Sequence, residues 1–260
     1  MQLTVVKIGG NIIDDITKLA FFLKNFSALP GHKILVHGGG KIATDLGKKL
    51  GLEPNYVNGR RVTDEETLSL VTMVYGGLIN KNIVADLQTH NCNAIGLTGA
   101  DGNFLPAVKR PVKEVDYGFV GDINSANINS ELLHNLILLG LVPVFAPLTH
   151  DEQGGMLNTN ADTIAQELAK AMAKHMTVQL IYCFEKRGVL SDPDDDNSVI
   201  GSISQQDMDG LKKNNIVSGG MLPKLENALT AISQGVEKVF IGHADDLQVI
   251  ISGKAGTCIR

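Results

Sequence analysis

Short apolar runs alternate with amphipathic segments along most of the 260 residues. Between the runs, apolar residues recur at helical spacing, as in Ile16, Leu19 and Leu23. This alternation predicts repeated strand–helix units, and therefore a three-layer α/β/α sandwich with a mainly parallel central sheet. The strands are expected at 3–8, 33–37, 94–97, 142–146, 178–183, 237–242 and 257–260, and helices near 132–139, 164–172 and 222–232.

Two further segments have a more specific local pattern. An Asn58-Gly59 pair between short extended arms predicts a hairpin over 53–63. Thr63 and Glu66 have the spacing of a capping box, which predicts a long helix from there to about His90. Residues 100–123 are expected to be irregular or hairpin structure.

Composition narrows the class of protein. The net charge of −5 argues against a nucleic-acid partner, which requires a basic face. Glycine is abundant, with 28 residues, which indicates many tight turns and close backbone approaches. Three widely spaced cysteines indicate neither a disulfide framework nor a metal knuckle. With no leader peptide or membrane-length apolar run evident, we expect a cytoplasmic protein with no membrane partner.

Candidate chemistry begins with glycine turns that follow two early strands. The first strand ends in Lys7 and is followed by Gly9-Gly10; the second ends in His37 and is followed by Gly38-Gly39-Gly40. Glycine turns at strand ends offer bare N–H groups to anions at the edge of an α/β sheet. Taken alone, Lys7-Ile8-Gly9-Gly10 is equally typical of a strand end with a flexible turn. The glycine spacing of phosphate-loop and dinucleotide-binding proteins is absent, which disfavours an oxidoreductase.

Two later segments add polar groups at predicted helix starts. Asn160 is a good N-cap, and Asp162 would then lie in the first turn, where a carboxylate is favoured. Lys224 lies just inside another predicted helix start, where a cation is disfavoured unless an anion is nearby.

Together these segments resemble the amino-acid kinase family, and within it the branch that acts on acylglutamates. The resemblance runs along essentially the whole chain and implies phosphorylation of the γ-carboxylate of an N-acylated glutamate by MgATP, the second step of arginine biosynthesis. The segments that carry it are Lys7-Ile8-Gly9-Gly10, His37-Gly38-Gly39-Gly40, Asn58-Gly59-Arg60-Arg61-Val62-Thr63, Leu157-Asn158-Thr159-Asn160-Ala161-Asp162 and Gly220-Met221-Leu222-Pro223-Lys224.

The resemblance also implies roles for individual residues. Lys7 and Lys224 would stabilise the transferring phosphoryl group from two sides, with Asp162 between them holding both in place. The N–H groups of Gly10, Gly39 and Gly40 would complete an anion cradle. Arg61 would bind the α-carboxylate of the substrate, and Asn158 its acylamino end. Mg²⁺ would be carried by phosphate oxygens and water, so no protein metal ligands are expected.

The nucleotide half departs from the family pattern. Where that pattern has Thr or Ser followed by Asp, this chain has Phe184 and Glu185, and a Lys-Arg pair follows. That basic pair would contact phosphates or only solvate the loop. By position, ATP contacts are expected from Glu185, Lys186, Arg187, Gly188, Val189, Leu190, Ile216, Val217 and Ser218.

The expected organisation is one domain with two lobes, about 1–150 for acylglutamate and dimerisation and about 151–260 for ATP. The predicted assembly is a homodimer insensitive to arginine. His37 and His243 are interpreted as structural, because a carboxylate acceptor needs no base. Two alternatives stay open: N-succinyl-L-glutamate as the substrate, with Arg60 binding its extra carboxylate, or a non-catalytic amino-acid or nucleotide sensor.

Overall fold

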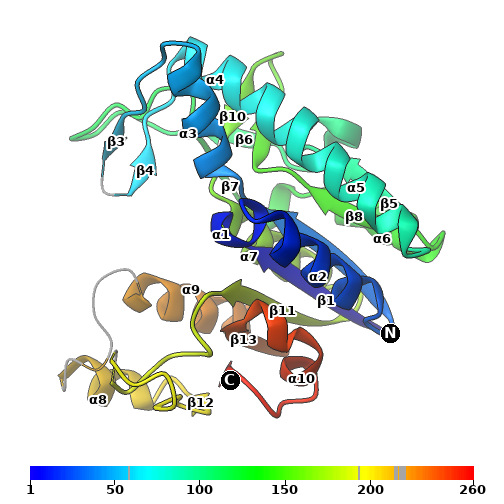
Figure 1. Cartoon of the computed structure of the whole chain (residues 1–260), viewed down its shortest axis with the longest axis vertical. Coiled ribbons are helices and arrows are strands. Elements are labelled where there is room, and N and C mark those ends of the chain that lie inside the picture. The colour runs from blue at the N-terminus through cyan, green and yellow to red at the C-terminus, as the bar shows by residue number, and fades with distance from the viewer. Residues whose placement is uncertain (58, 193, 214–215, 217–220) are drawn as a thin grey trace.

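The central feature of the computed structural model is an eight-stranded sheet with the order β12-β14-β13-β11-β1-β2-β8-β5. The structure describes residues 1–57, 59–192, 194–213, 216 and 221–260. Neighbouring strands are parallel except β13 and β14. Figure 1 shows β1 and β11 side by side in the middle of the molecule. The strands are β1 (Gln2–Ile8), β2 (His32–His37), β5 (Ala94–Leu97), β8 (Val142–Phe145), β11 (Thr177–Phe184), β12 (Ser202–Ile203), β13 (Lys238–His243) and β14 (Thr257–Ile259).

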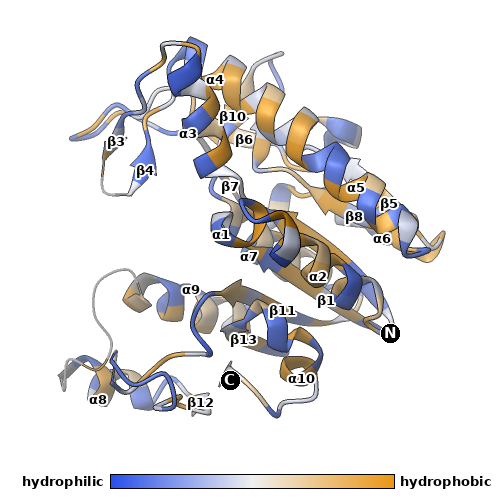
Figure 2. Cartoon of the chain, viewed as in Figure 1, coloured by the Kyte–Doolittle hydropathy of each residue, from blue (hydrophilic) through white to orange (hydrophobic). Residues whose placement is uncertain are grey.

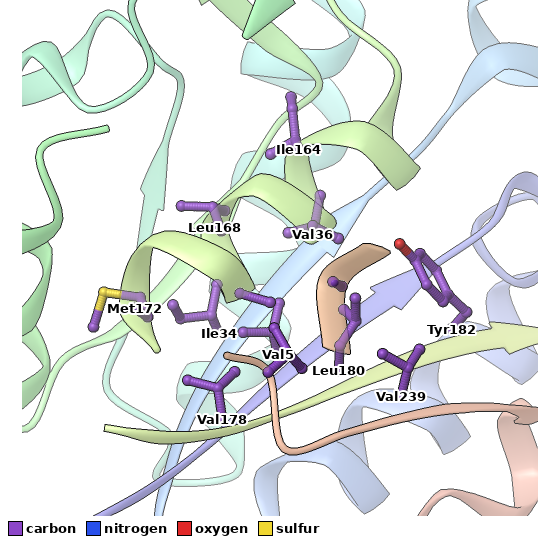
Figure 3. Packing of buried hydrophobic residues seen from close by; sticks show 14 of the residues in the cluster. Val5, Ile34, Val36, Ile164, Leu168, Met172, Val178, Leu180, Tyr182 and Val239 are labelled. Carbon is purple, nitrogen blue, oxygen red and sulfur yellow. The ribbon is translucent and has the colours of Figure 1, made fainter. Parts of the chain in front are cut away.

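Helices cover both faces of this sheet and close two apolar cores. One core joins the sheet to α6 (Ser130–Leu138), α7 (Ala161–Met172), α8 (Asp207–Lys213) and α9 (Met221–Ser233). Figure 3 shows Ile164, Leu168 and Met172 of α7 packed over the strands of this face. The other core joins the sheet to α1 (Gly10–Ile13), α2 (Ile16–Ser27), α3 (Gly40–Lys49), α10 (Leu247–Ile251) and the long helical run 65–89. The predicted three-layer α/β/α fold is confirmed.

In the part of the chain that the structure describes, three small hairpins lie outside the main sheet. The predicted hairpin at 53–63 is present as β3 (Tyr56–Val57) and β4 (Arg60–Arg61), and its turn residue Asn58 lies outside the described residues. A second pairs β6 (Ala107–Lys109) with β7 (Gly121–Ile123), within the segment expected to be irregular or hairpin. The third, β9 (Leu148–His150) with β10 (Met156–Asn158), was not predicted.

The long helix predicted to reach His90 is present but differs at its start. It consists of α4 (Glu65–Val71), a π-helical turn η1 (Thr72–Ile79) and α5 (Asn80–Thr89). The predicted capping box is wrong: Asp64 is the N-cap and accepts from the Thr67 N–H, whereas Thr63 forms a β-bridge with Gly118. Asp64 competes successfully because a carboxylate is the better charge at a helix N-terminus.

The same helical run, Glu65–Thr89, is long and apolar enough to meet the length and composition of a membrane span, although the sequence analysis found none. In the structure its side chains Leu70, Val74 and Ile83 are buried in the second core. We therefore describe it as a core helix of the fold. Helices α8 and α10 and the edge strand β12 were also not predicted, since each is too short to show a period.

Candidate active site

The carboxyl ends of three neighbouring strands bring the candidate residues together. Ile8 at the end of β1 is in register with His37 of β2 on one side and with Cys183 of β11 on the other. The turns that follow these strands therefore meet at one edge of the sheet. In parallel sheets, this edge is where ligands bind.

Lys7 reaches this edge from a buried strand face. Leu3 and Val5 of β1 pack into the core under α7, and Lys7 continues their alternation on the same face with 8% of its surface exposed. Its Nζ lies 2.7 Å from Asp162 Oδ1. Because both groups are largely shielded from water, each charge is stabilised mainly by the other, and the ion pair fixes the direction of the Lys7 side chain.

Asp162 is positioned by the start of α7. Asn160 is the N-cap, as predicted, and its Oδ1 accepts from the N–H groups of Asp162 (2.8 Å) and Thr163 (3.1 Å). Tyr182 of β11 donates to the Asp162 carbonyl at 3.3 Å. The cap therefore fixes the first turn from which the carboxylate reaches Lys7.

Lys224 enters from the first turn of α9, which lies beside α7 through a hydrogen bond from Gln166 to the Asn227 carbonyl. Lys224 and Lys7 line one cavity. Burial lowers the pKa of Lys224; the nearby Asp162 carboxylate opposes this shift and the Lys7 ammonium adds to it. Within the described residues, Asp162 pairs with Lys7 only, and the Lys224 ammonium lies over the ring of Phe184.

A cavity of about 250 Å³ lies at the ends of β1 and β2. It brings together every residue that was predicted to bind the acceptor or to line the cradle. Tyr56, Tyr75 and Arg110 also line it and were not predicted. The predicted residues in its wall are Lys7, Gly10, Gly39, Gly40, Arg61, Asn158 and Asp162.

Arg61 is buried in the wall of this cavity. Its Nη2 donates to the Gly40 carbonyl at 2.9 Å, to Thr44 Oγ1 at 2.7 Å and to the Tyr56 hydroxyl, while its guanidinium lies 4.7 Å from the Tyr56 ring centroid. These contacts use one of its nitrogens and fix the plane of the group. A fixed planar guanidinium is suited to a carboxylate.

The triple-glycine turn has a conformation that only glycine adopts without strain. Gly39 has φ +143°, and a Cβ there would overlap the Ile79 side chain. Gly39 is the N-cap of α3 and provides no side chain to cap it. The first N–H groups of α3 are therefore left for a ligand, and Gly39 and Gly40 line the cavity.

His37 lies behind this turn, fully buried. Its Nδ1 is 2.8 Å from the Gly38 carbonyl, which only accepts, so Nδ1 carries the proton; Nε2 then accepts from Asn80 Nδ2 at 3.1 Å. Burial lowers the His37 pKa to about 4, so the ring is neutral at pH 7. His37 is therefore packed and hydrogen-bonded at the strand end, as the sequence analysis expected.

A second cavity of about 380 Å³ shares Lys7, Gly9 and Gly10 with the first and extends along the end of β11. Of the residues predicted to bind ATP, Glu185, Lys186 and Gly188 line it. Residues that line it and were not predicted are Asn11, Ile12, Cys183, Phe184, Met221 and Ile241. Strand alternation could have found Phe184, which follows Tyr182 by two residues on the face of β11 that covers the core.

Four other predicted nucleotide residues are described by the structure and do not line this cavity. Val189 and Leu190 are buried, and Ile216 packs against the first core. Arg187 faces a neighbouring pocket with His243. Val217 and Ser218 lie outside the described residues.

One residue of the Lys186-Arg187 pair forms an ion pair at the protein surface. Lys186 pairs with Asp196 at 2.7 Å, and both side chains are more than half exposed. His243, interpreted as structural, accepts from the Asp245 N–H and caps a short helical turn. Among the described residues, no three His, Cys, Asp or Glu side chains are grouped as a metal site.

Comparisons with known proteins agree on one family. The sequence profile of the "Amino acid kinase family" matches residues 2–243. The acetylglutamate kinase of Parabacteroides distasonis is 56% identical over 246 residues, covering 95% of this chain and 96% of the relative. That of Bacteroides thetaiotaomicron is 57% identical over 247 residues, 95% of each chain. The crystal structure of smu.665 from Streptococcus mutans superposes with a TM-score of 0.79 at 27% identity, covering 99% and 98% of the two chains.

Proposed function

The chain belongs to the amino acid kinase family, and on that premise we propose that it transfers the γ-phosphoryl group of ATP to the side-chain carboxylate of N-acetyl-L-glutamate. This is the activity named for its relatives, and it would serve arginine biosynthesis. The observation that carries the proposal is the position of Lys7. Its side chain, paired with Asp162, lines both cavities at the point where they share Gly9 and Gly10.

The chemistry needs charge and alignment rather than a base. A glutamate side chain titrates near pH ~4.3, so the acceptor is already an anion at pH 7. One carboxylate oxygen attacks the γ-phosphorus, and the bond to the bridging oxygen breaks with its electron pair leaving on ADP. The obstacle is repulsion between two anions, which Lys7 would offset from the wall that both cavities share and Lys224 from the wall of the second cavity.

The acceptor would lie in the first cavity. We assign the α-carboxylate to Arg61, whose guanidinium is already oriented, and the acylamino group to Asn158, whose Nδ2 donates to Thr63 at 3.0 Å. The γ-carboxylate would then face the N–H groups of Gly39 and Gly40 and the Lys7 ammonium. Gly10 would donate to the phosphoryl oxygens, since it lines both cavities.

The second cavity would hold the nucleotide. Lys7, Lys224 and the glycine turn are suited to a polyphosphate, and Glu185 and Gly188 lie along the same wall. When bound with ATP, Mg²⁺ would supply charge neutralisation at the phosphates, and in this proposal phosphate oxygens and water would hold it. Asp162 would keep Lys7 directed at the phosphoryl group.

The proposal also covers the two lobes of the domain and the assembly of the protein. Residues of about 1–150, joined by Asn158, would bind the acylglutamate and residues of about 151–260 the ATP, with each lobe contributing one lysine. We further propose a cytoplasmic homodimer that is insensitive to arginine. An exposed apolar face of η1, with Met73 60% and Leu78 50% exposed, supports a second copy as its partner.

The decisive experiment measures acyl phosphate trapped as a hydroxamate with MgATP. Product with N-acetyl-L-glutamate, lost in a Lys7→Met variant, is the expected result. N-succinyl-L-glutamate is assayed in parallel, because Arg60 adds a cation to the acceptor cavity, and Arg110, which is paired with Asp122, lies in the same wall. If only the succinyl compound is phosphorylated, N-succinyl-L-glutamate and not N-acetyl-L-glutamate is the substrate. No product with either compound would overturn the kinase proposal in favour of a sensor.

A further inference from the structure

Phe184 contacts both lysines of the site through the face of one ring. The Lys224 ammonium lies 3.7 Å from its centroid and the Lys7 ammonium 5.5 Å. Both distances fall within the ~6 Å over which an aromatic face attracts a cation. Phe184 also lines the second cavity, so its ring belongs to the wall that faces the nucleotide.

The ring is held in that position by the sheet. Tyr182 of β11 is in register with Lys7 of β1, and Phe184 follows it by two residues on the same face. The two aromatic rings stack with centroids 6.2 Å apart and planes 21° from parallel. Because Tyr182 is buried in the core under α7, it gives Phe184 a fixed support.

The charge balance of the site shows why an aromatic ring is useful there. Asp162 is the ion-pair partner of Lys7, and within the described residues Lys224 forms no ion pair. Burial of Lys224 and the proximity of Lys7 both disfavour its ammonium form, which is reflected in its lowered pKa. A second carboxylate would offset this cost, but it would repel the phosphates of ATP. An aromatic face attracts the ammonium without adding a negative charge.

We propose that Phe184 is a positioning residue whose ring face holds the Lys224 ammonium, and more weakly that of Lys7, against the nucleotide cavity before the phosphates arrive. It takes the place of a second carboxylate in the site. The inference rests on the proposed phosphoryl transfer, in which these two lysines contact the phosphates. Lys224 lines only the nucleotide cavity, so the effect belongs to nucleotide binding and transfer and not to acceptor binding.

The test varies the ring's attraction for cations while keeping its shape. Phenylalanine at 184 is replaced by 4-fluoro-, 3,5-difluoro- and 3,4,5-trifluorophenylalanine, which progressively weaken the negative face of the ring. We expect kcat/KM for ATP to fall stepwise, by roughly 3- to 10-fold across the series, with KM for the acceptor unchanged. Phe184→Tyr should stay within about 2-fold of the parent, and Phe184→Leu should lose at least as much as the trifluoro variant.

The control is a second lysine–phenylalanine pair remote from the site. The Lys33 ammonium lies 5.6 Å from the centroid of the Phe26 ring, and Phe26 is buried in the second core. The same fluorinated series at position 26 should leave kcat/KM unchanged. A response at 26 as large as at 184 would overturn the proposal, because fluorine would then act through general packing.

The dissociation constant of magnesium AMP-PNP separates this proposal from the assigned substrate, since it needs no acceptor. It should weaken in the same order along the series at 184. A flat series, with loss only in Phe184→Leu, would show that the ring acts by filling space and would overturn the proposal. If neither acylglutamate is turned over but the dissociation constants follow the series, the substrate assignment fails and the role of Phe184 stands.

Discussion

At the scale of single residues, one carboxylate sets the direction of Lys7, one of the two lysines proposed to contact the phosphates. Asp162 is held by the Asn160 cap on one side and by its 2.7 Å contact with Lys7 on the other. We expect Asp162→Asn to lower kcat by about 10²-fold, because Lys7 loses its orientation while the shape of the side chain is kept. Nucleotide affinity should not weaken, since a negative charge next to the phosphates is removed.

Steady-state kinetics and titration with magnesium AMP-PNP would measure both effects. Glu167→Gln is the matched control, because Glu167 forms a buried ion pair with Lys170 at 2.6 Å on the same helix, α7. It should reduce stability and leave kcat within about 2-fold of the parent. Equal losses of kcat in both variants would contradict the role given to Asp162.

His37 predicts a specific pH dependence of stability. Its pKa is lowered from 6.5 to about 4 in the folded protein, so between these values the unfolded chain binds the additional proton. The stabilisation is therefore complete above pH 6.5 and is lost as the pH falls towards 4, by up to about 3 kcal/mol. Urea unfolding across this range should show that loss.

His37→Asn keeps an amide donor for the Gly38 carbonyl and removes the titrating ring. Its stability should depend less on pH than that of the parent below pH 6.5. Parallel curves for the two proteins would show that another group is responsible. The dependence of activity on pH near neutrality should be the same for both proteins, because the His37 ring carries no charge there.

At the scale of elements, the start of α3 depends on a backbone conformation more than on any side chain. Gly39 combines φ +143° with a Cβ position that overlaps Ile79. Gly39→Ala should reduce stability by about 1–3 kcal/mol and lower kcat by 10²-fold or more, since the turn must move away from the acceptor. Unfolding curves and hydroxamate assays would measure the two losses.

Gly51→Ala is a useful comparison, because Gly51 has φ +79° and no atom near its Cβ position. Gly51→Ala should lower the free energy of unfolding and leave kcat unchanged. Adding Ile79→Val to Gly39→Ala removes the overlapping methyl group and should restore part of the activity. No recovery would place the defect in the backbone angle and not in the contact with Ile79.

The elements also show what the sequence can and cannot predict. Strands such as 94–97 and helices such as α7 were predictable, because burial of one face gives the apolar residues a clear period. For α7, Asn160 also marks the N-cap in the sequence. The pairing of β9 with β10 was not, because three-residue strands show no period. Thr63 was misassigned because Asp64, one residue on, is the stronger cap.

At the scale of the whole molecule, motifs distant in the chain were predicted to meet, and the strand register brings them together. Lys7, Arg61, Asn158 and Asp162 line one cavity. Asp162 was predicted to hold Lys224 as well as Lys7, but among the ion pairs of the described residues it joins Lys7 alone. Whether a lysine contacts a carboxylate or a ring depends on side-chain positions that motif spacing does not encode, and here the ring of Phe184 is nearer.

Assembly provides the last prediction at this scale. Figure 2 shows hydrophobic colour along the middle of the long helix that contains η1 and α5, and Met73 and Leu78 are exposed on it. If this face is covered by a second copy, Leu78→Glu should produce a monomer, since a charge at an apolar interface loses its hydration. Sedimentation or light scattering would report the mass.

Ile16→Glu is the control, because Ile16 is 87% exposed at the start of a different helix, α2, where an acidic residue is well tolerated. It should leave the mass of the parent unchanged. A parent that is already monomeric, or a Leu78→Glu variant that keeps the parent's mass, would contradict this interface. In the second case a dimer must form elsewhere, and the apolar face of η1 would need another partner, because an exposed patch of this kind is unfavourable in water.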